Sequence, residues 1–281
     1  MWKITVPPEK EEDLVYRLNE AEMYSFFIQE AIQITKNFDG YSYIKDSNGS
    51  QMLFIDDQMY PEASVIADVL GIPKEKIDWE KLDDSVEEYK DRPIVNGWEL
   101  QYPPFEHRHD KSICLDPQGA FGTGLHGTTI DMLSIIAEEE PAPSNVLDAG
   151  TGSGILAVGA ALKGAQVDAF DIQPVTREVM AQASLNHVEQ QITVYEKDLL
   201  AEVPPRRSYD WIVVNIGASF SIEMLVYLKK HNVHFNKLAI SGIIEWSTEA
   251  VEQACVLAGL EKEKHKVSGE WHTMLWTKKG V

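Results

Sequence analysis

The residues with the strongest chemical signal form a glycine-rich turn, Asp148-Ala-Gly-Thr-Gly-Ser-Gly154. The apolar run at 145–149 predicts a buried strand before the turn, and the apolar segment after it predicts a helix. Gly150, Gly152 and Gly154 allow a tight turn in which the backbone approaches a ligand with no Cβ in the way. Such a turn can bind a nicotinamide dinucleotide, or it can be an ordinary strand-to-helix connection.

Two carboxylates favour a different nucleoside cofactor. Asp148, just before the turn, would repel a pyrophosphate but attract the ammonium group of S-adenosylmethionine. Asp171 ends a second strand-like run, 21 residues after Gly150, where an acidic residue accepts hydrogen bonds from two ribose hydroxyls. The alternative for Asp171 is a cap on the helix expected near Pro174. Asp198, after a third run, is a candidate for the adenine amino group or a plain surface acid.

Asn215 ends a fourth strand-like run and is the candidate catalytic residue. In a Rossmann-like methyltransferase sheet, the carboxyl end of the fourth strand faces the methyl group of the cofactor. A carboxamide oxygen there can accept a hydrogen bond from a target amine. Transfer from a sulfonium depends mainly on proximity and alignment, so little acid–base machinery is needed. The alternative for Asn215 is an N-cap or turn residue.

A longer set of motifs resembles one protein family. The motifs are Phe121-Gly-Thr-Gly-x-His126-x-Thr-Thr129, Leu147-Asp-x-Gly-x-Gly-Ser-Gly-Ile-Leu-Ala157 and Asn215-Ile-x-Ala218. Over about residues 112–277 they resemble the ribosomal protein L11 methyltransferase (PrmA) family. This resemblance implies cofactor contacts from Thr129, Gly150, Asp171 and Asn215. It also implies that Phe121 and Thr123 lie over the methionine and substrate side.

The chain departs from the family pattern at three places. Gly127 stands where the family usually has proline, and Gly217 where it usually has leucine. The linker of the family usually carries a tryptophan-rich segment, whereas this chain has Glu88-Tyr-Lys-Asp-Arg92. These departures bear on the protein substrate rather than on cofactor binding. For His126, ordering of its own loop is preferred over a role as general base.

The elements that must position these residues form two domains. Runs at 2–6, 11–22, 26–35, 51–55 and 61–70 predict strand, helix, strand, strand and helix, a small α+β domain that resembles a ferredoxin-like fold. Such a domain commonly serves recognition. Residues 78–91 are mostly charged and lead to Pro93, which indicates a linker, or a solvated helix face. We expect domains at 1–80 and 94–281, with a linker at 81–93.

The second domain is predicted to be an α/β domain with a mostly parallel, Rossmann-like methyltransferase sheet. Strand-like runs at 145–149, 166–171, 192–195, 211–215 and 238–241 alternate with helix-length segments. The final two runs, 260–267 and 270–277, are joined by Ser268-Gly269. A connection of this length joins antiparallel strands, so the last strand should be antiparallel.

Composition narrows the partners and the compartment. The net charge of −20 argues against a surface for duplex nucleic acid and favours a basic partner. Cys114 and Cys255 make neither a disulfide framework nor a metal site, and we expect no metal. No stretch approaches about 18 apolar residues, and the N-terminus has no leader pattern. We therefore expect a soluble, cytoplasmic protein without membrane contact; the oligomeric state is not predicted.

Together these patterns predict an S-adenosylmethionine-dependent protein methyltransferase. Its target would be amine nitrogens, mainly lysine ε-amino groups, of a ribosomal large-subunit protein of the L11 type, and residues 1–80 would select that substrate. Three alternatives stay open: a lysine methyltransferase of another protein such as the electron-transfer flavoprotein β-subunit, a small-molecule methyltransferase, and a cofactor-binding interaction protein without transfer activity.

Overall fold

The computed structural model describes residues 1–46, 49–80, 89–117, 122–140, 142–206 and 208–279. The chain divides into two compact units, one of residues 1–37 and 41–86, the other of residues 38–40 and 87–281. Most of the predicted linker at 81–93 lies outside the described residues, so the linker stays a prediction.

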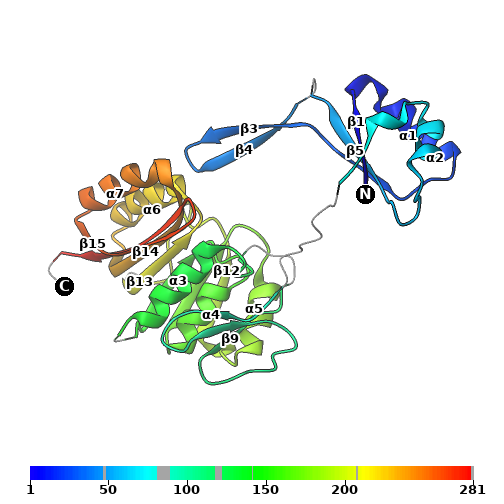
Figure 1. Ribbon diagram of the computed structural model, residues 1–281. Coiled ribbons are helices and arrows are strands. Elements are labelled where there is room, and N and C mark those ends of the chain that lie inside the picture. The colour runs from blue at the N-terminus through cyan, green and yellow to red at the C-terminus, as the bar shows by residue number, and fades with distance from the viewer. Residues whose placement is uncertain (47–48, 81–88, 118–121, 141, 207, 280–281) are drawn as a thin grey trace. The chain divides into compact units, whose positions relative to one another are not determined.

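The first unit has a four-stranded antiparallel sheet with two helices packed on one face (Figure 1). Its elements are β1 (Trp2–Val6), a 3-10 turn at Pro8–Lys10, α1 (Glu11–Glu20), β2 (Phe26–Gln29), β5 (Gln51–Ile55), α2 (Ala63–Leu70), a 3-10 turn at Lys74–Lys76 and β6 (Ile77–Trp79). The strand order β2-β5-β1-β6 confirms the ferredoxin-like expectation. Leu18 and Ile66 join Leu53 in its core.

Three local predictions in this unit are wrong. The single strand predicted over 26–35 is two strands, because the chain leaves the sheet after β2. It then forms a separate two-stranded sheet from β3 (Ile32–Asn37) and β4 (Gly40–Lys45). The first two residues of the charged segment 78–91, predicted to be a linker or a solvated helix face, belong instead to β6. α1 ends before Glu22, whose φ of 55° a helix does not allow.

The second unit is built on a seven-stranded sheet. Its strands are β10 (Asn145–Ala149), β11 (Gln166–Asp171), β12 (Ile192–Glu196), β13 (Ser208–Asn215), β14 (His234–Ile244), β15 (Leu260–Ser268) and β16 (Trp271–Lys278). The order is β12-β11-β10-β13-β14-β16-β15, with β10 to β14 parallel and β16 antiparallel to both of its neighbours. The predicted parallel sheet with an antiparallel last strand is confirmed.

Helices cover both faces of this sheet (Figure 1). They are α3 (Gly127–Glu138), α4 (Ile155–Leu162), α5 (Thr176–Leu185), α6 (Ala218–Lys230) and α7 (Thr248–Leu257), with 3-10 turns at Glu189–Gln191 and Glu245–Ser247. α3, α4 and α5 pack with Val146 of β10 in one core, and α6 and α7 pack with Leu147 in the other. Neighbouring residues of one strand therefore point to opposite faces of the sheet, and both faces are covered by helices.

A small three-stranded sheet, absent from the predictions, precedes α3. It consists of β7 (Arg92–Pro93), β8 (Glu99–Gln101) and β9 (Ser112–Cys114). Leu100 and Ile113 are buried against the same core as α3 and α4. Strands this short carry no usable hydrophobic period, which is why the sequence does not reveal them.

Candidate functional site

The glycine turn follows β10 with three residues in the left-handed region. Gly150, Gly152 and Gly154 have φ values of 75°, 54° and 83°. A Cβ on Gly150 would lie 2.6 Å from Cδ1 of Ile216, and one on Gly154 would lie 2.8 Å from Cγ1 of Val179. The turn therefore depends on glycine for its backbone conformation and for its close packing against neighbouring side chains.

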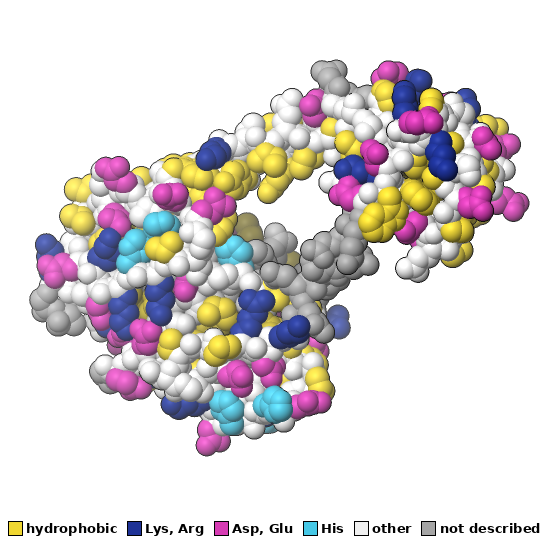
Figure 2. Space-filling model, viewed as in Figure 1, with side chains coloured by type: hydrophobic (Ala, Val, Ile, Leu, Met, Phe, Trp, Pro, Cys, Tyr) yellow, Lys and Arg dark blue, Asp and Glu magenta, His cyan; other side chains and the backbone are white. Residues whose placement is uncertain are grey.

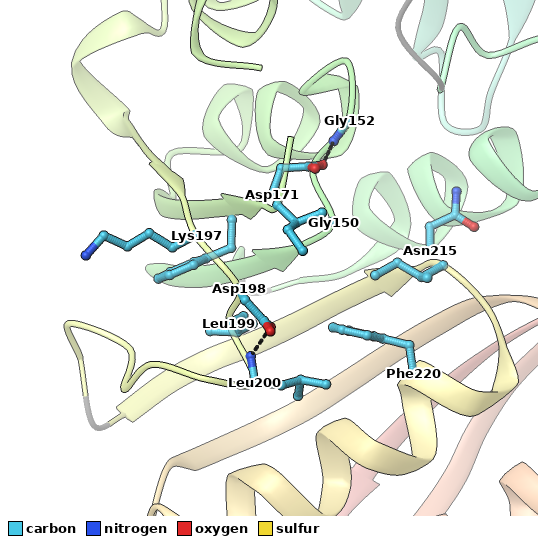
Figure 3. Close-up of a pocket in the computed structure, with 12 residues that line it drawn as sticks. Gly150, Gly152, Asp171, Lys197, Asp198, Leu199, Leu200, Asn215 and Phe220 are labelled. Atoms are coloured by element: carbon cyan, nitrogen blue, oxygen red, sulfur yellow. Dashed lines mark hydrogen bonds between the residues drawn. The ribbon is translucent and has the colours of Figure 1, made fainter. Parts of the chain in front are cut away.

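Asp171, at the end of β11, braces this turn. The N–H of Gly152 donates to Oδ2 at 2.9 Å, and the N–H of Gln173 donates to Oδ1 at 2.9 Å. A carboxylate oxygen can accept more than one hydrogen bond, so both oxygens keep acceptor capacity. Figure 3 shows the Asp171 carboxylate beside Gly152.

A cavity of about 510 Å³ lies at this edge of the sheet (Figure 3). It brings together five of the predicted site residues: Gly150, Gly152, Asp171, Asp198 and Asn215. Seven further lining residues were not predicted from the sequence: Phe170, Ile172, Lys197, Leu199, Leu200, Ile216 and Phe220. The sequence offered one signal, because Ile172 follows Asp171 directly. In the structure this residue is 71% exposed. An exposed apolar side chain next to a polar acceptor suits a flat ring with polar edges.

Asp198 and Lys197 lie on the loop after β12. Oδ1 of Asp198 accepts the N–H of Leu200 at 2.9 Å, which orders the loop (Figure 3). Nζ of Lys197 donates to Glu202 at 2.8 Å. The cation is thus paired with a carboxylate, while Asp198 stands on the cavity wall as an exposed acceptor.

Asn215 lines the cavity at the end of β13. Its side chain is half-buried, and Figure 3 shows the carboxamide pointing away from Phe220. A Cβ on Gly242 would lie 3.5 Å from its Oδ1. The next strand, β14, therefore approaches the carboxamide closely. The role of Asn215 in catalysis stays a prediction.

Asp148 lies beneath the turn and does not line the cavity. It is 1% exposed, and Oγ1 of Thr151 donates to its Oδ2 at 2.7 Å. Burial, with a smaller contribution from the charge of Asp171, raises the pKa of Asp148 from 3.8 to about 7. A direct contact with an ammonium group in the cavity stays a prediction.

The remaining predicted residues that the structure describes do not line the cavity. Thr129, in the first turn of α3, is 1% exposed, and its Oγ1 has no hydrogen-bond partner among the described residues. The carbonyl of Thr123 accepts a hydrogen bond from Tyr102. Gly154 packs on α5, as described above. Phe121 lies outside the described residues.

The loop before α3 also contains His126 and Gly127. Nδ1 of His126 is 2.8 Å from Oγ1 of Thr128, and its ring meets that of Trp271 edge-on. These contacts suit a side chain that orders its own loop. A Cβ on Gly127 would lie 2.5 Å from Cβ of Ser268, so a proline here would collide with the turn between β15 and β16.

Within the described ranges, no group of three His, Cys, Asp or Glu side chains could hold a metal ion. No helix in the described part of the chain is long and apolar enough to span a membrane.

Comparisons with known proteins agree with the fold. A family model described as ribosomal protein L11 methyltransferase (PrmA) matches residues 2–279. A ribosomal protein L11 methyltransferase of Streptococcus pneumoniae (strain Hungary19A-6) is 29% identical over 98% of this chain and 95% of its own length. One of Streptococcus pyogenes serotype M3 (strain ATCC BAA-595 / MGAS315) is 30% identical over 78% of this chain and 77% of its own.

A solved structure is similar as well. The ribosomal protein L11 methylase of Lactobacillus delbrueckii subsp. bulgaricus is 28% identical and has a TM-score of 0.60. The match covers 68% of this chain and 100% of that one.

Proposed function

Because this chain belongs to the ribosomal protein L11 methyltransferase (PrmA) family, we propose that it transfers methyl groups from S-adenosylmethionine to ribosomal protein L11. The acceptors would be amine nitrogens, mainly lysine ε-amino groups. One observation carries the proposal: a glycine turn and a braced carboxylate, Asp171, face the same cavity at the carboxyl edge of the parallel sheet.

The residues present fit this cofactor. The backbone at Gly150 and Gly152 lies open to the cavity without a Cβ. Asp171 keeps acceptor capacity for two ribose hydroxyls, and Asp198 offers an acceptor for the adenine amino group. A contact of the cofactor with Thr129 stays a prediction, since its buried Oγ1 has no partner among the described residues but does not line the cavity. Ile172, with its exposed apolar surface, would cover the flat face of the adenine.

When bound, S-adenosylmethionine supplies an activated methyl group on its sulfonium. The chain has then to bring a neutral amine into line with that methyl. The carboxamide oxygen of Asn215 would accept a hydrogen bond from the amine. The apolar wall at Ile216 and Phe220 would favour the neutral form of a lysine, because desolvation lowers the pKa of an amine.

Residues 1–80 would select the protein substrate, since the cavity is built entirely from the second unit. The net charge of −20 suits a lysine-bearing partner. Acidic side chains are spread over both units on the face that Figure 2 shows. A ribosomal substrate also implies work in the cytoplasm.

The test is transfer of a tritiated methyl group from the cofactor to purified ribosomal protein L11, followed by mass spectrometry of the product. We expect label on amine nitrogens of L11 with the wild-type chain. Asp171→Ala should label it far more slowly at a cofactor concentration near the wild-type Kd. Absence of label on L11, with label on another protein or a small molecule in a lysate, would refute the proposed substrate.

A further inference from the structure

The loop at 122–126, directly before α3, is tied to the glycine turn. Oγ of Ser153 donates to the carbonyl of Gly122 at 2.9 Å. Ser153 is 4% exposed and belongs to the turn itself. This part-buried hydrogen bond, whose donor residue is itself buried, fixes the start of the loop against the backbone that borders the cavity.

The other side of the loop rests on Tyr102, which follows β8. Oη of Tyr102 donates to the carbonyl of Thr123 at 2.6 Å, and the residue is 2% exposed. A Cβ on Gly124 would lie 2.1 Å from Cδ2 of Leu100 and 2.7 Å from Oη of Tyr102. The loop backbone therefore lies directly on these two side chains, and a small displacement of either one would be transmitted to it.

Residues 89–92 hold Tyr102 and the loop from outside. Oδ1 of Asp91 accepts the N–H of Tyr102 at 3.2 Å, and the ring of Tyr89 lies 5.2 Å from that of Tyr102. Nη1 of Arg92 donates to the carbonyl of Leu125 at 3.1 Å. The loop is thus held at three carbonyls, those of Gly122, Thr123 and Leu125, by side chains from three different segments.

We propose that Tyr102 is a positioning residue for methyl transfer, and that Arg92 supports it. Acting through the Thr123 carbonyl, the Tyr102 hydroxyl keeps the loop seated against the glycine turn. The inference rests on the proposed function, because the loop matters for rate only if the glycine turn to which it is tied borders the site of methyl transfer. A loop that shifts by a fraction of an ångström would misalign the reacting groups and slow transfer without removing any binding contact.

Tyr102→Phe is the direct test, since it keeps the ring that packs on Gly124 and Tyr89 and removes one hydroxyl. With L11 as substrate we expect kcat to fall about ten- to a hundredfold, with KM for L11 changed less than about threefold. Amide hydrogen exchange at residues 122–125 should become at least about tenfold faster. Arg92→Gln should act in the same direction. The double variant should lose less than the product of the two effects, because both side chains hold one loop.

The matched control is Tyr209→Phe. Its hydroxyl is also buried, donates to Asp168 at 2.8 Å, and lies at the opposite end of β13 from Asn215. We expect its kcat and its loop exchange to equal those of the wild type, whatever stability it loses. Unchanged kcat in Tyr102→Phe, or an equal loss in Tyr209→Phe, would overturn the proposal.

Exchange also separates this proposal from the proposed function. If the wild type does not methylate L11, the function fails. If residues 122–125 of Tyr102→Phe exchanged their amide hydrogens at the same rate as in the wild type, the Tyr102 hydroxyl would not hold the loop.

Discussion

Asp148→Asn is the variant with the most distinctive pH dependence. The wild-type carboxyl is 1% exposed, and its pKa is raised from 3.8 to about 7 by burial and by the nearby charge of Asp171. Asparagine has the same shape, can accept the hydrogen bond from Thr151 and carries no charge at any pH. It therefore removes the cost of ionising this site and little else.

Proton linkage gives the direction and the size of the change in stability with pH. Because the pKa is higher in the folded chain, the folded state binds the proton more tightly. The resulting stabilisation is fully present below the unfolded pKa of 3.8 and is lost as the pH rises through about 7. A shift of about three pKa units corresponds to about 4 kcal/mol. Between about pH 5 and about pH 8, Asp148→Asn should gain about 3 kcal/mol of stability relative to wild type.

The assay is urea unfolding of both proteins at the two pH values. Taking the difference between them cancels the titration of other groups, because these are common to both chains. A difference in unfolding free energy that stays constant across this range would refute the reasoning. A second readout concerns the ligand. If Asp148 attracts the cofactor ammonium, the variant should bind S-adenosylmethionine more weakly above about pH 7 while being more stable there.

The remaining predictions concern the cavity, an ion-pair network and the first unit. Asp171→Asn should weaken S-adenosylmethionine binding by about 1.5–3 kcal/mol in calorimetry. Asp210→Asn makes the same exchange at a carboxylate away from the cavity, whose Oδ2 accepts two backbone N–H groups, and should bind normally. If Asp171→Asn bound the cofactor as tightly as Asp210→Asn, Asp171 would not belong to the site. Asn215→Ala should lower kcat about ten- to a thousandfold. Asn215→Asp should move the rate optimum to higher pH. The N-cap of α6 is Gly217, without a side-chain cap, so an unshifted pH–rate profile would show that the Asn215 side chain does not contact the amine. In Glu139→Gln, the free energy of unfolding should fall less steeply with decreasing pH than in the wild type. Burial opposes ionisation of Glu139, but hydrogen bonds from Lys237 and Lys264 lower its pKa, so its contribution disappears as the pH falls through its range. A chain starting at residue 87 should still bind the cofactor in calorimetry but lose L11 methylation; full activity would show that residues 1–80 do not select the substrate.

The large sheet was predictable because its signals are local and redundant. The run 145–149 is long enough to mark a buried strand, and Ser268-Gly269 is too short to join anything but antiparallel strands. The first unit was predictable in its order but not in its pairing. Phe26 to Thr35 is one strand-like run in sequence, and nothing local shows that β3 leaves the sheet to pair with β4. Strand pairing depends on distant partners.

The candidate site likewise contains residues that could be predicted from the sequence and residues that could not. Gly150, Gly152, Asp171, Asp198 and Asn215 were predictable because each follows directly on a strand whose carboxyl end reaches the same edge. The apolar wall was not, since an isoleucine or a phenylalanine after a strand looks the same whether it lines a cavity or packs in a core. The link from Tyr102 to Thr123 joins segments 21 residues apart through one hydroxyl, and no periodicity reports such a contact.

The close approach of Gly127 and Ser268 has a consequence for how this chain can change. Oγ of Ser268 donates to Asp131 of α3, and its Cβ occupies the space that any larger residue at 127 would need. Gly127→Pro alone should therefore be harmful, even though proline is favoured at a first helical position. After Ser268→Gly the same change should be tolerated. The two sites are epistatic, and the order in which substitutions arise decides which variants are accessible.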